Sequence, residues 1–186
     1  MNTFIKTKKG GSIIPKIIDG LREELLLSAR QILFSEGYDA FTIRAVAAAC
    51  HVAVGTVYNY FDSKVMMVAE VILEDWKAAL LRMDAPTPGE TPFEGLRRIF
   101  SELIAFYDKY DALWKEYAAG NSAPLQGPYH LQLVEQLGQR IAAVLAPCAP
   151  LCAPVLPEFL AETFLTAASR GRARFDELTP ILKRLL

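Results

Sequence analysis

Residues 52–61 read VAVGTVYNYF, a weak helix-forming segment between two stretches of helical pattern. Four of its ten residues are β-branched, and Gly55 lies in its middle, where glycine costs about 1 kcal/mol relative to alanine in a helix. The next residues, Asp62 to Lys64, have the composition of a new helix start. As a helix, the segment must therefore be stabilised by packing on the neighbouring helices. This packing does not explain its polar residues.

A helical wheel at about 100° per residue separates the two sides of this segment. Val57 and Phe61 point together towards the core, with Ala53 close by. Gly55 and Asn59 fall on the opposite side. The flanks carry a hydroxyl and two phenols, from Thr56, Tyr58 and Tyr60. The exposed ridge therefore combines a residue without a side chain, which permits close approach, with groups that form hydrogen bonds.

The residues before this segment predict a helix-turn-helix. A helix is expected over Ile43–Ala49 after the capping residue Thr42, and Cys50–Ala53 form a short turn. In a helix-turn-helix the second helix enters the major groove of DNA. Polar side chains of modest size on its outer ridge are suited to reading base edges.

The rest of the chain predicts an all-α fold, because apolar residues recur with helical period and no alternating strand pattern is present. In the first helix, Asp19 is the expected N-cap and Gly37 the expected stop. Its expected apolar stripe is Leu21, Leu25, Ser28 with Ala29, Ile32 and Leu33. A long helix is expected from Lys64 to about Met83, capped by Asp62 or Ser63. The other predicted helices are about 19–36, 43–49, 92–107, 111–119, 128–145, 155–170 and 176–185.

Charge and composition favour a globular chain in a reducing compartment. The net charge over 186 residues is −1, yet residues 1–18 carry four lysines and no acid: Lys6, Lys8, Lys9 and Lys16. Three cysteines are too few for a disulfide scaffold. The uncharged run 141–157 is interrupted by four prolines, which argues against a membrane span. We expect a cytoplasmic protein with no signal peptide and no membrane segment.

The segment FTIRAVAAACHVAVGTVYNYFDSK at 41–64 resembles the helix-turn-helix of the tetracycline-repressor (TetR) family of bacterial transcription regulators. The resemblance covers about residues 19–70, and the remainder matches only in length and helical character. It implies a three-helix DNA-binding domain over 19–63 and a helical bundle for ligand binding and dimerisation over 64–186. The four lysines of residues 1–18 make this segment a basic N-terminal arm. The positions in register are Val46-Ala47, Val52, Gly55-Thr56, Tyr58, Tyr60-Phe61 and Ser63-Lys64.

Two positions depart from the family pattern. His51 occupies a turn position that is usually glycine, and histidine adopts left-handed conformations more readily than most residues, so the turn is expected to persist. Ala53 replaces the serine or threonine that usually caps the second helix. This helix start is therefore expected to lack a side-chain cap, and a DNA contact from residue 53 is in doubt.

The resemblance implies two classes of DNA contact. Phosphate contacts are expected from Thr42, Arg44, Tyr58, Tyr60 and Lys64, and base contacts from Val54, Gly55, Thr56 and Asn59. The alternative for the two tyrosines is a half-buried aromatic ring, and for Lys64 a solvated surface lysine. The arm lysines either enter or flank the minor groove, or belong to a solubilising tail.

The C-terminal part is expected to bind a small molecule and to dimerise. The resemblance implies a cavity for a small apolar or aromatic ligand, lined by Phe100, Leu103, Tyr107, Trp114 and Tyr117; plain core packing is the alternative. It also implies a homodimer through 128–145 and 155–170. Their apolar sides are Leu131, Val134, Leu137, Ile141 and Leu145, and Leu156, Phe159, Leu160, Thr163, Phe164 and Ala167.

No metal site, cofactor or catalytic constellation is expected. Cys50-His51 lacks further ligands nearby, and Cys148 with Cys152 is interpreted as a pair of thiols, with redox sensing as the alternative. We interpret the chain as a ligand-responsive repressor that binds a palindromic operator in double-stranded DNA, and not as an enzyme. The rivals are a helical-bundle binding protein or enzyme without DNA binding, and an architectural DNA binder without a ligand.

Overall fold

The computed structural model describes residues 18–113, 115, 130–148, 153–171 and 174–185. Every regular element among them is helical, which confirms the all-α prediction. The chain divides into two compact units, residues 1–71 and 72–186, and the division falls inside α4. The helices are α1 (Leu21–Ala40), α2 (Ile43–Ala49), α3 (Val54–Tyr58), α4 (Lys64–Met83), α5 (Pro92–Lys109), α7 (His130–Leu145), the short 3₁₀ helix η1 (Ala146–Cys148), α8 (Leu156–Arg170) and α9 (Phe175–Leu185).

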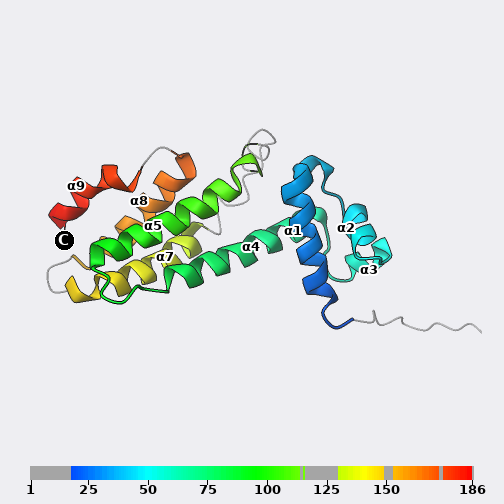
Figure 1. Cartoon of the computed structure of the whole chain (residues 1–186), viewed down its shortest axis with the longest axis horizontal. Helices are drawn as coiled ribbons and strands as arrows, with labels where there is room; N and C mark the ends of the chain where they lie inside the picture. Colours follow the sequence, from blue (N-terminus) through cyan, green and yellow to red (C-terminus); the bar gives the residue numbers. More distant parts are fainter. Residues whose placement is uncertain (1–17, 114, 116–129, 149–152, 172–173, 186) are drawn as a thin grey trace, which may run out of the picture. The chain divides into compact units, whose positions relative to one another are not determined.

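In the N-terminal unit, α1 to α3 lie together with the first turns of α4 (Figure 1). Their apolar side chains form a buried core. Arg22 of α1 forms an ion pair with Glu70 of α4 at 2.9 Å, and its guanidinium lies over the Phe61 ring. This contact explains why the start of α4 belongs to the N-terminal unit, although the domain boundary predicted from the sequence is Lys64. The core includes Leu25, Val46, Val57, Phe61 and Met67.

The predicted ends of α1 are partly wrong. The N-cap is Gly20, in a left-handed conformation with φ 76°, and not Asp19. At the other end Gly37 does leave helical geometry, with φ 84° and ψ 172°, and a further turn follows it to Ala40. The predicted apolar stripe misses the buried Leu26 and includes Ile32, which is half-buried.

The second helix and the fourth begin as the sequence predicts. The Thr42 hydroxyl accepts a hydrogen bond from the Ala45 amide at 3.0 Å and caps α2. The Ser63 hydroxyl accepts one from the Met66 amide at 3.2 Å at the start of α4. Side-chain caps of this kind satisfy amides that have no partner inside the helix.

In the C-terminal unit α5, α7 and α8 run side by side, and α9 packs on α5 (Figure 1). The second half of α4 joins this bundle through Trp76, whose ring lies 5.1 Å from Phe106 and whose indole donates to Gln136 at 2.7 Å. Helices α5 and α7 approach each other closely at Gly95. A Cβ added at this position would lie 2.7 Å from a methyl carbon of Val144. Of the predicted helix 111–119, residues 111–113 and 115 are helical and the remainder lies outside the described residues.

The apolar sides expected at the dimer interface are mostly buried within the subunit. Leu137, Ile141 and Phe164 are fully buried, because α7 and α8 pack on each other and on α5. Two members of the predicted set remain exposed, Leu131 on α7 and Phe159 on α8. The other apolar residues of the predicted set pack inside the subunit. The apolar pattern alone could not distinguish such packing from a dimer interface.

Candidate nucleic-acid interface and candidate ligand site

The weak helix-forming segment 52–61 contains α3, a helix of five residues from Val54 to Tyr58. Val57 and Phe61 are buried, while Gly55 and Asn59 are exposed, so the two sides of the helical wheel are confirmed. Ala53 is exposed rather than near the core. Its backbone is extended, with φ −69° and ψ 146°, so the periodicity of a helix does not apply to it.

The two departures from the family pattern behave as expected. His51 has φ 54° and therefore adopts the left-handed conformation that the turn between α2 and α3 requires. Ala53 is the N-cap of α3 and provides no side-chain hydrogen bond. Backbone bonds close the turn instead, including that from the Val52 amide to the Ala47 carbonyl at 2.9 Å.

The residues predicted to contact bases form the exposed side of α3. Val54, Gly55 and Asn59 are exposed, and Thr56 is half-buried. The Asn59 side chain makes no hydrogen bond within the described part of the chain, so its amide is available to a ligand. An added Cβ on Gly55 would meet no atom within 4 Å, so the surface here is open.

The residues predicted to contact phosphate fall into two groups. Thr42, Arg44 and Tyr58 are exposed, and Thr42 also caps α2. Tyr60 and Lys64 are half-buried and already have partners inside the protein. The Tyr60 hydroxyl binds the backbone of Ile18, and the Lys64 ammonium donates to the Tyr38 carbonyl at 2.6 Å. The sequence did not indicate either internal contact.

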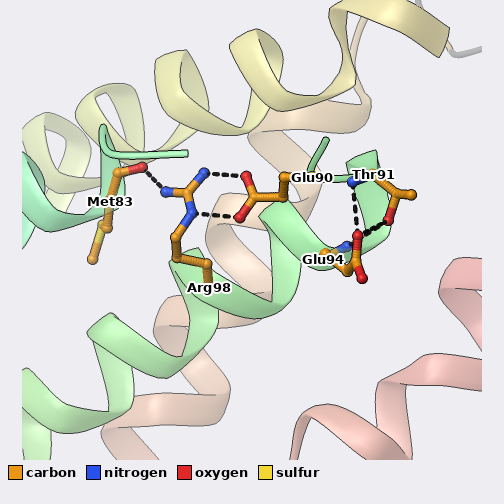
Figure 2. Close-up of polar contacts among 5 residues, drawn as sticks. All are labelled: Met83, Glu90, Thr91, Glu94 and Arg98. Atoms are coloured by element: carbon orange, nitrogen blue, oxygen red, sulfur yellow. Dashed lines mark hydrogen bonds and ion pairs between the residues drawn. The ribbon is translucent and has the colours of Figure 1, made fainter. Parts of the chain in front are cut away.

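The C-terminal unit contains a half-open pocket of about 360 Å³ at the junction of α4, α5 and α7. In one wall, the Arg98 guanidinium donates to both carboxylate oxygens of Glu90, at 2.8 and 2.7 Å, and to the Met83 carbonyl (Figure 2). The hydrogen bonds from Arg98 lower the pKa of the Glu90 carboxyl, and Glu90 raises the pKa of Arg98. The lining residues are Met83, Asp84, Pro86, Thr87, Gly89, Glu90, Thr91, Pro92, Arg98, Arg140, Ala143, Val144 and Pro147.

The sequence did not predict this pocket. Thr91 and Glu94 form a capping box with Pro92 at the first turn of α5, and the Thr-x-x-Glu spacing after a proline-rich loop was the available signal (Figure 2). That signal predicts the start of the helix, but not the ion pair between Glu90 and Arg98. The pairing of Arg140 with Asp84 at 2.8 Å is likewise a tertiary contact between distant positions.

The residues predicted to line an apolar ligand cavity lie elsewhere. Phe100 and Leu103 are fully buried, and the Phe100 ring packs at 5.0 Å from Phe164 and 5.7 Å from Phe175. Tyr107 is half-buried, and burial raises the pKa of its hydroxyl. Trp114 lies outside the residues whose side chains are described, and Tyr117 lies outside the described residues altogether.

The described residues offer neither a membrane-spanning helix nor a metal site. None of their helices is long and apolar enough to cross a bilayer. They hold no group of three or more histidine, cysteine or acidic side chains arranged for a metal ion. Cys50 is buried, with its thiol 3.1 Å from the Ser28 hydroxyl, Cys148 is half-buried and free, and Cys152 lies outside the described residues.

Known sequences similar to this chain are regulators, and the similarity covers less than half of its length. The HTH-type transcriptional repressor KstR of Rhodococcus jostii (strain RHA1) is 37% identical over 83 residues, which cover 44% of this chain and 39% of KstR. The HTH-type transcriptional regulator UidR of Escherichia coli (strain K12) is 32% identical over 68 residues, or 37% of this chain and 35% of UidR. The matched region thus spans about two fifths or less of these curated relatives.

Solved structures share the fold over most of the chain. A TetR regulator from Streptomyces coelicolor superposes with a TM-score of 0.59 at 19% identity, covering 86% of this chain and 75% of that one. FadR of Thermus thermophilus, a TetR-family repressor solved with lauroyl-CoA, gives 0.58 at 24% identity, covering 88% and 92%. Residues 25–71 also match the family described as bacterial regulatory proteins, tetR family. These residues form α2, α3 and parts of α1 and α4, so the match to this family lies on the helix-turn-helix and the helices that pack on it.

Proposed function

We propose that this protein is a sequence-specific DNA-binding transcriptional regulator, a ligand-responsive repressor that acts as a homodimer on a palindromic operator. The observation that carries the proposal is the exposed ridge of α3, where Gly55 leaves an open surface and the Asn59 amide has no internal partner within the described chain. An asparagine amide can bind adenine through two hydrogen bonds in the major groove. The names of KstR and UidR agree with this function.

The homodimer is proposed to form through the outer faces of α7 and α8. Three large apolar side chains remain more than half exposed: Val155 at the N-cap of α8, Phe159 on α8 and Leu131 on α7. Replacing Leu131 and Phe159 together with glutamate should give a monomer by sedimentation and weaken binding to a full palindrome. Leu81 on α4 is 71% exposed and provides the matched control, since Leu81→Glu should leave the dimer intact.

The ligand is proposed to be a small apolar or aromatic molecule bound in the C-terminal unit near Phe100, Leu103 and Tyr107. Trp76 of α4 packs on Phe106 of α5, so a change at this face of α5 has a direct route to the helix that also enters the N-terminal unit. The acyl ligand of FadR motivates testing acyl compounds first. A coupling of about 1–3 kcal/mol, or 5- to 150-fold in DNA affinity, is the expected scale.

The rival function is a helical-bundle binding protein or enzyme that has no DNA partner. We assign no enzymatic activity, and we expect the protein to act in the cytoplasm, where its operator lies. An architectural DNA binder without a ligand is the further alternative, and it would be favoured if no acyl or aromatic compound altered DNA affinity.

Selection from randomised duplex DNA with the purified protein separates these functions. The expected result is enrichment of one site with two-fold symmetry, because a symmetric dimer reads two equivalent half-sites. Enrichment of a single asymmetric half-site would retain DNA recognition and remove the dimer. Absence of any enriched sequence would reject the proposed function and favour the rival.

A further inference from the structure

The turn between α2 and α3 contains a strained residue. Among the residues that the structure describes, His51 is the one residue other than glycine with a positive φ, at 54°. The remaining positive-φ positions are Gly20, Gly37, Gly89 and Gly171. A side chain in this conformation has a steric cost that glycine avoids. Strain of this kind is concentrated at functional positions, so the His51 side chain invites a functional explanation.

The imidazole of His51 is available to a ligand. The residue is exposed, and within the described part of the chain its ring forms no hydrogen bond or ion pair. Its backbone amide donates to the Ala48 carbonyl at 3.2 Å. The other histidine of the chain differs, because Nε2 of His130 lies 2.9 Å from the Glu162 carboxylate. His51 therefore presents both ring nitrogens at the surface of the helix-turn-helix.

The segment around His51 has little charge of its own. Arg44 is the only residue from 40 to 61 that carries a permanent charge, and α3 contributes none. Helix α1, which packs on α2, brings the exposed Glu24 nearby, since the Cys50 thiol donates to the Glu24 carbonyl at 3.7 Å. Protonation of His51 would raise the positive charge of the segment 40–61 from one to two.

His51 also lies close to the surface that is proposed to read bases. Val54, the first residue of α3, is three residues further along the chain, and three residues span about 11 Å at most. The major groove is about 12 Å wide. An exposed side chain this close to a residue in the groove can reach one of the two phosphate backbones that border it.

We propose that His51 is a phosphate ligand in its protonated form, so that affinity for operator DNA rises as the pH falls through the range in which histidine titrates. This inference rests on the proposed DNA-binding function. The histidine side chain ordinarily changes charge between about pH 5 and pH 8, and the charged ring donates from both nitrogens. A phosphate favours this charged ring over the neutral one. DNA binding is therefore coupled to the uptake of a proton from solution by His51.

The test measures affinity for the duplex obtained by selection at about pH 6 and about pH 8, at one salt concentration. The natural protein should bind about 2- to 10-fold more tightly per half-site at the lower pH, the scale of one net hydrogen bond. His51→Asn and His51→Gly should match the natural protein at the higher pH and lack this gain at the lower pH. Asparagine and glycine both accept the left-handed conformation, so each variant keeps the turn.

His130→Gln is the matched control, because the chain has two histidines and this change removes the other one. It should retain the pH dependence of the natural protein. At the lower pH, the salt slope of the natural protein should exceed that of His51→Asn by about 0.9 for each phosphate contact. Affinity for scrambled duplexes should change in parallel, because phosphate contacts carry no sequence information.

Two further measurements accompany the affinities. Calorimetry in buffers of different ionisation enthalpy should show proton uptake when the natural protein binds DNA, and His51→Asn should lack this uptake. Thermal unfolding checks that each variant is folded.

Four outcomes would overturn the inference. Equal affinities of the natural protein and both His51 variants at the lower pH would mean that His51 only shapes the turn. An equal loss at both pH values would mean that the contact does not need the proton. A loss confined to the selected duplex would indicate a base contact, and a pH dependence that His130→Gln removes would assign the effect to the other histidine. Each of these results leaves specific binding by the natural protein intact, whereas failure of the natural protein to retain any specific duplex at either pH rejects the proposed function itself.

Discussion

The ammonium group of Lys64 donates a hydrogen bond of 2.6 Å to the Tyr38 carbonyl and lies 3.8 Å from the centre of the Tyr38 ring. Tyr38 directly follows Gly37, where α1 leaves helical geometry. Lys64, the first residue of α4, therefore ties the start of one helix to the irregular end of another. The sequence suggested either a phosphate contact or a solvated surface position for Lys64, and the structure gives it a partner inside the protein.

Replacing Lys64 with alanine should therefore change both folding and DNA binding. Removal of a charge-assisted hydrogen bond and of the stacked cation should cost about 1.5–3 kcal/mol of unfolding free energy. Binding to specific and scrambled duplexes should weaken nearly equally, with a lower salt slope. Urea unfolding and a salt series measure the two effects. A lower salt slope with unchanged stability would mean that the contact with Tyr38 contributes nothing to folding.

For Asn59 we expect an effect on DNA binding without an effect on folding. Its side chain is exposed and has no hydrogen bond within the described chain, so Asn59→Ala should leave stability unchanged within about 0.5 kcal/mol. The same change should cost about 1–3 kcal/mol on the best DNA site and relax preference at one base position in each half-site. Competition between the selected duplex and single-base variants is the measurement. Equal weakening on all duplexes would show that Asn59 does not read a base.

Gly55→Ala should raise the stability of the protein and lower its affinity for DNA. The added methyl meets no atom within 4 Å in the protein, and Gly55 does not have a positive φ, so the variant should gain about 0.5–1 kcal/mol of stability. On DNA the same methyl would occupy the surface that approaches the bases, and affinity should fall. Ala69→Gly, at an exposed position in α4, is the control and should be less stable while binding DNA normally. A stabilised Gly55→Ala variant with full affinity would exclude close approach at this residue.

How well each feature could be predicted from the sequence depends on how local it is. The buried side of α3 followed from spacing within ten residues, and the start of α2 followed from the single hydroxyl of Thr42. The internal contacts of Tyr60 and Lys64 could not be predicted from local spacing, because their partners, Ile18 and Tyr38, are 42 and 26 residues away. A helical pattern indicates which side of a residue is buried, but it does not identify a distant backbone group.

The same reason explains the C-terminal unit. Helix boundaries were predicted to within a few residues, because caps, prolines and apolar periodicity are local signals. The apolar sides of α7 and α8 were correctly identified as apolar, yet Leu137 and Phe164 are buried inside the subunit. Whether an apolar side faces a dimer interface or the core of the subunit depends on the positions of all the neighbouring helices. Tertiary packing determines these positions, and a local sequence pattern does not contain them.

The ion pair between Glu90 and Arg98 predicts a stability that depends on pH. Their side chains are only 9% and 17% exposed, so Arg98→Met would leave a carboxylate largely removed from water, at a cost of up to about 3 kcal/mol near neutral pH. Because the hydrogen bonds from Arg98 lower the pKa of Glu90 below its ordinary 4.5, the stabilisation is complete above that value and is lost as pH falls through the lower, folded-state pKa. The destabilisation by Arg98→Met should therefore shrink on acidification from pH 7 to about pH 3, measured by urea unfolding.

Arg82→Ala, which breaks the more exposed pair with Glu102, is the control and should cost at most about 1 kcal/mol at pH 7. An Arg98→Met effect as small as that of Arg82→Ala, or one that persists at low pH, would mean that the charge of Glu90 is not what Arg98 stabilises.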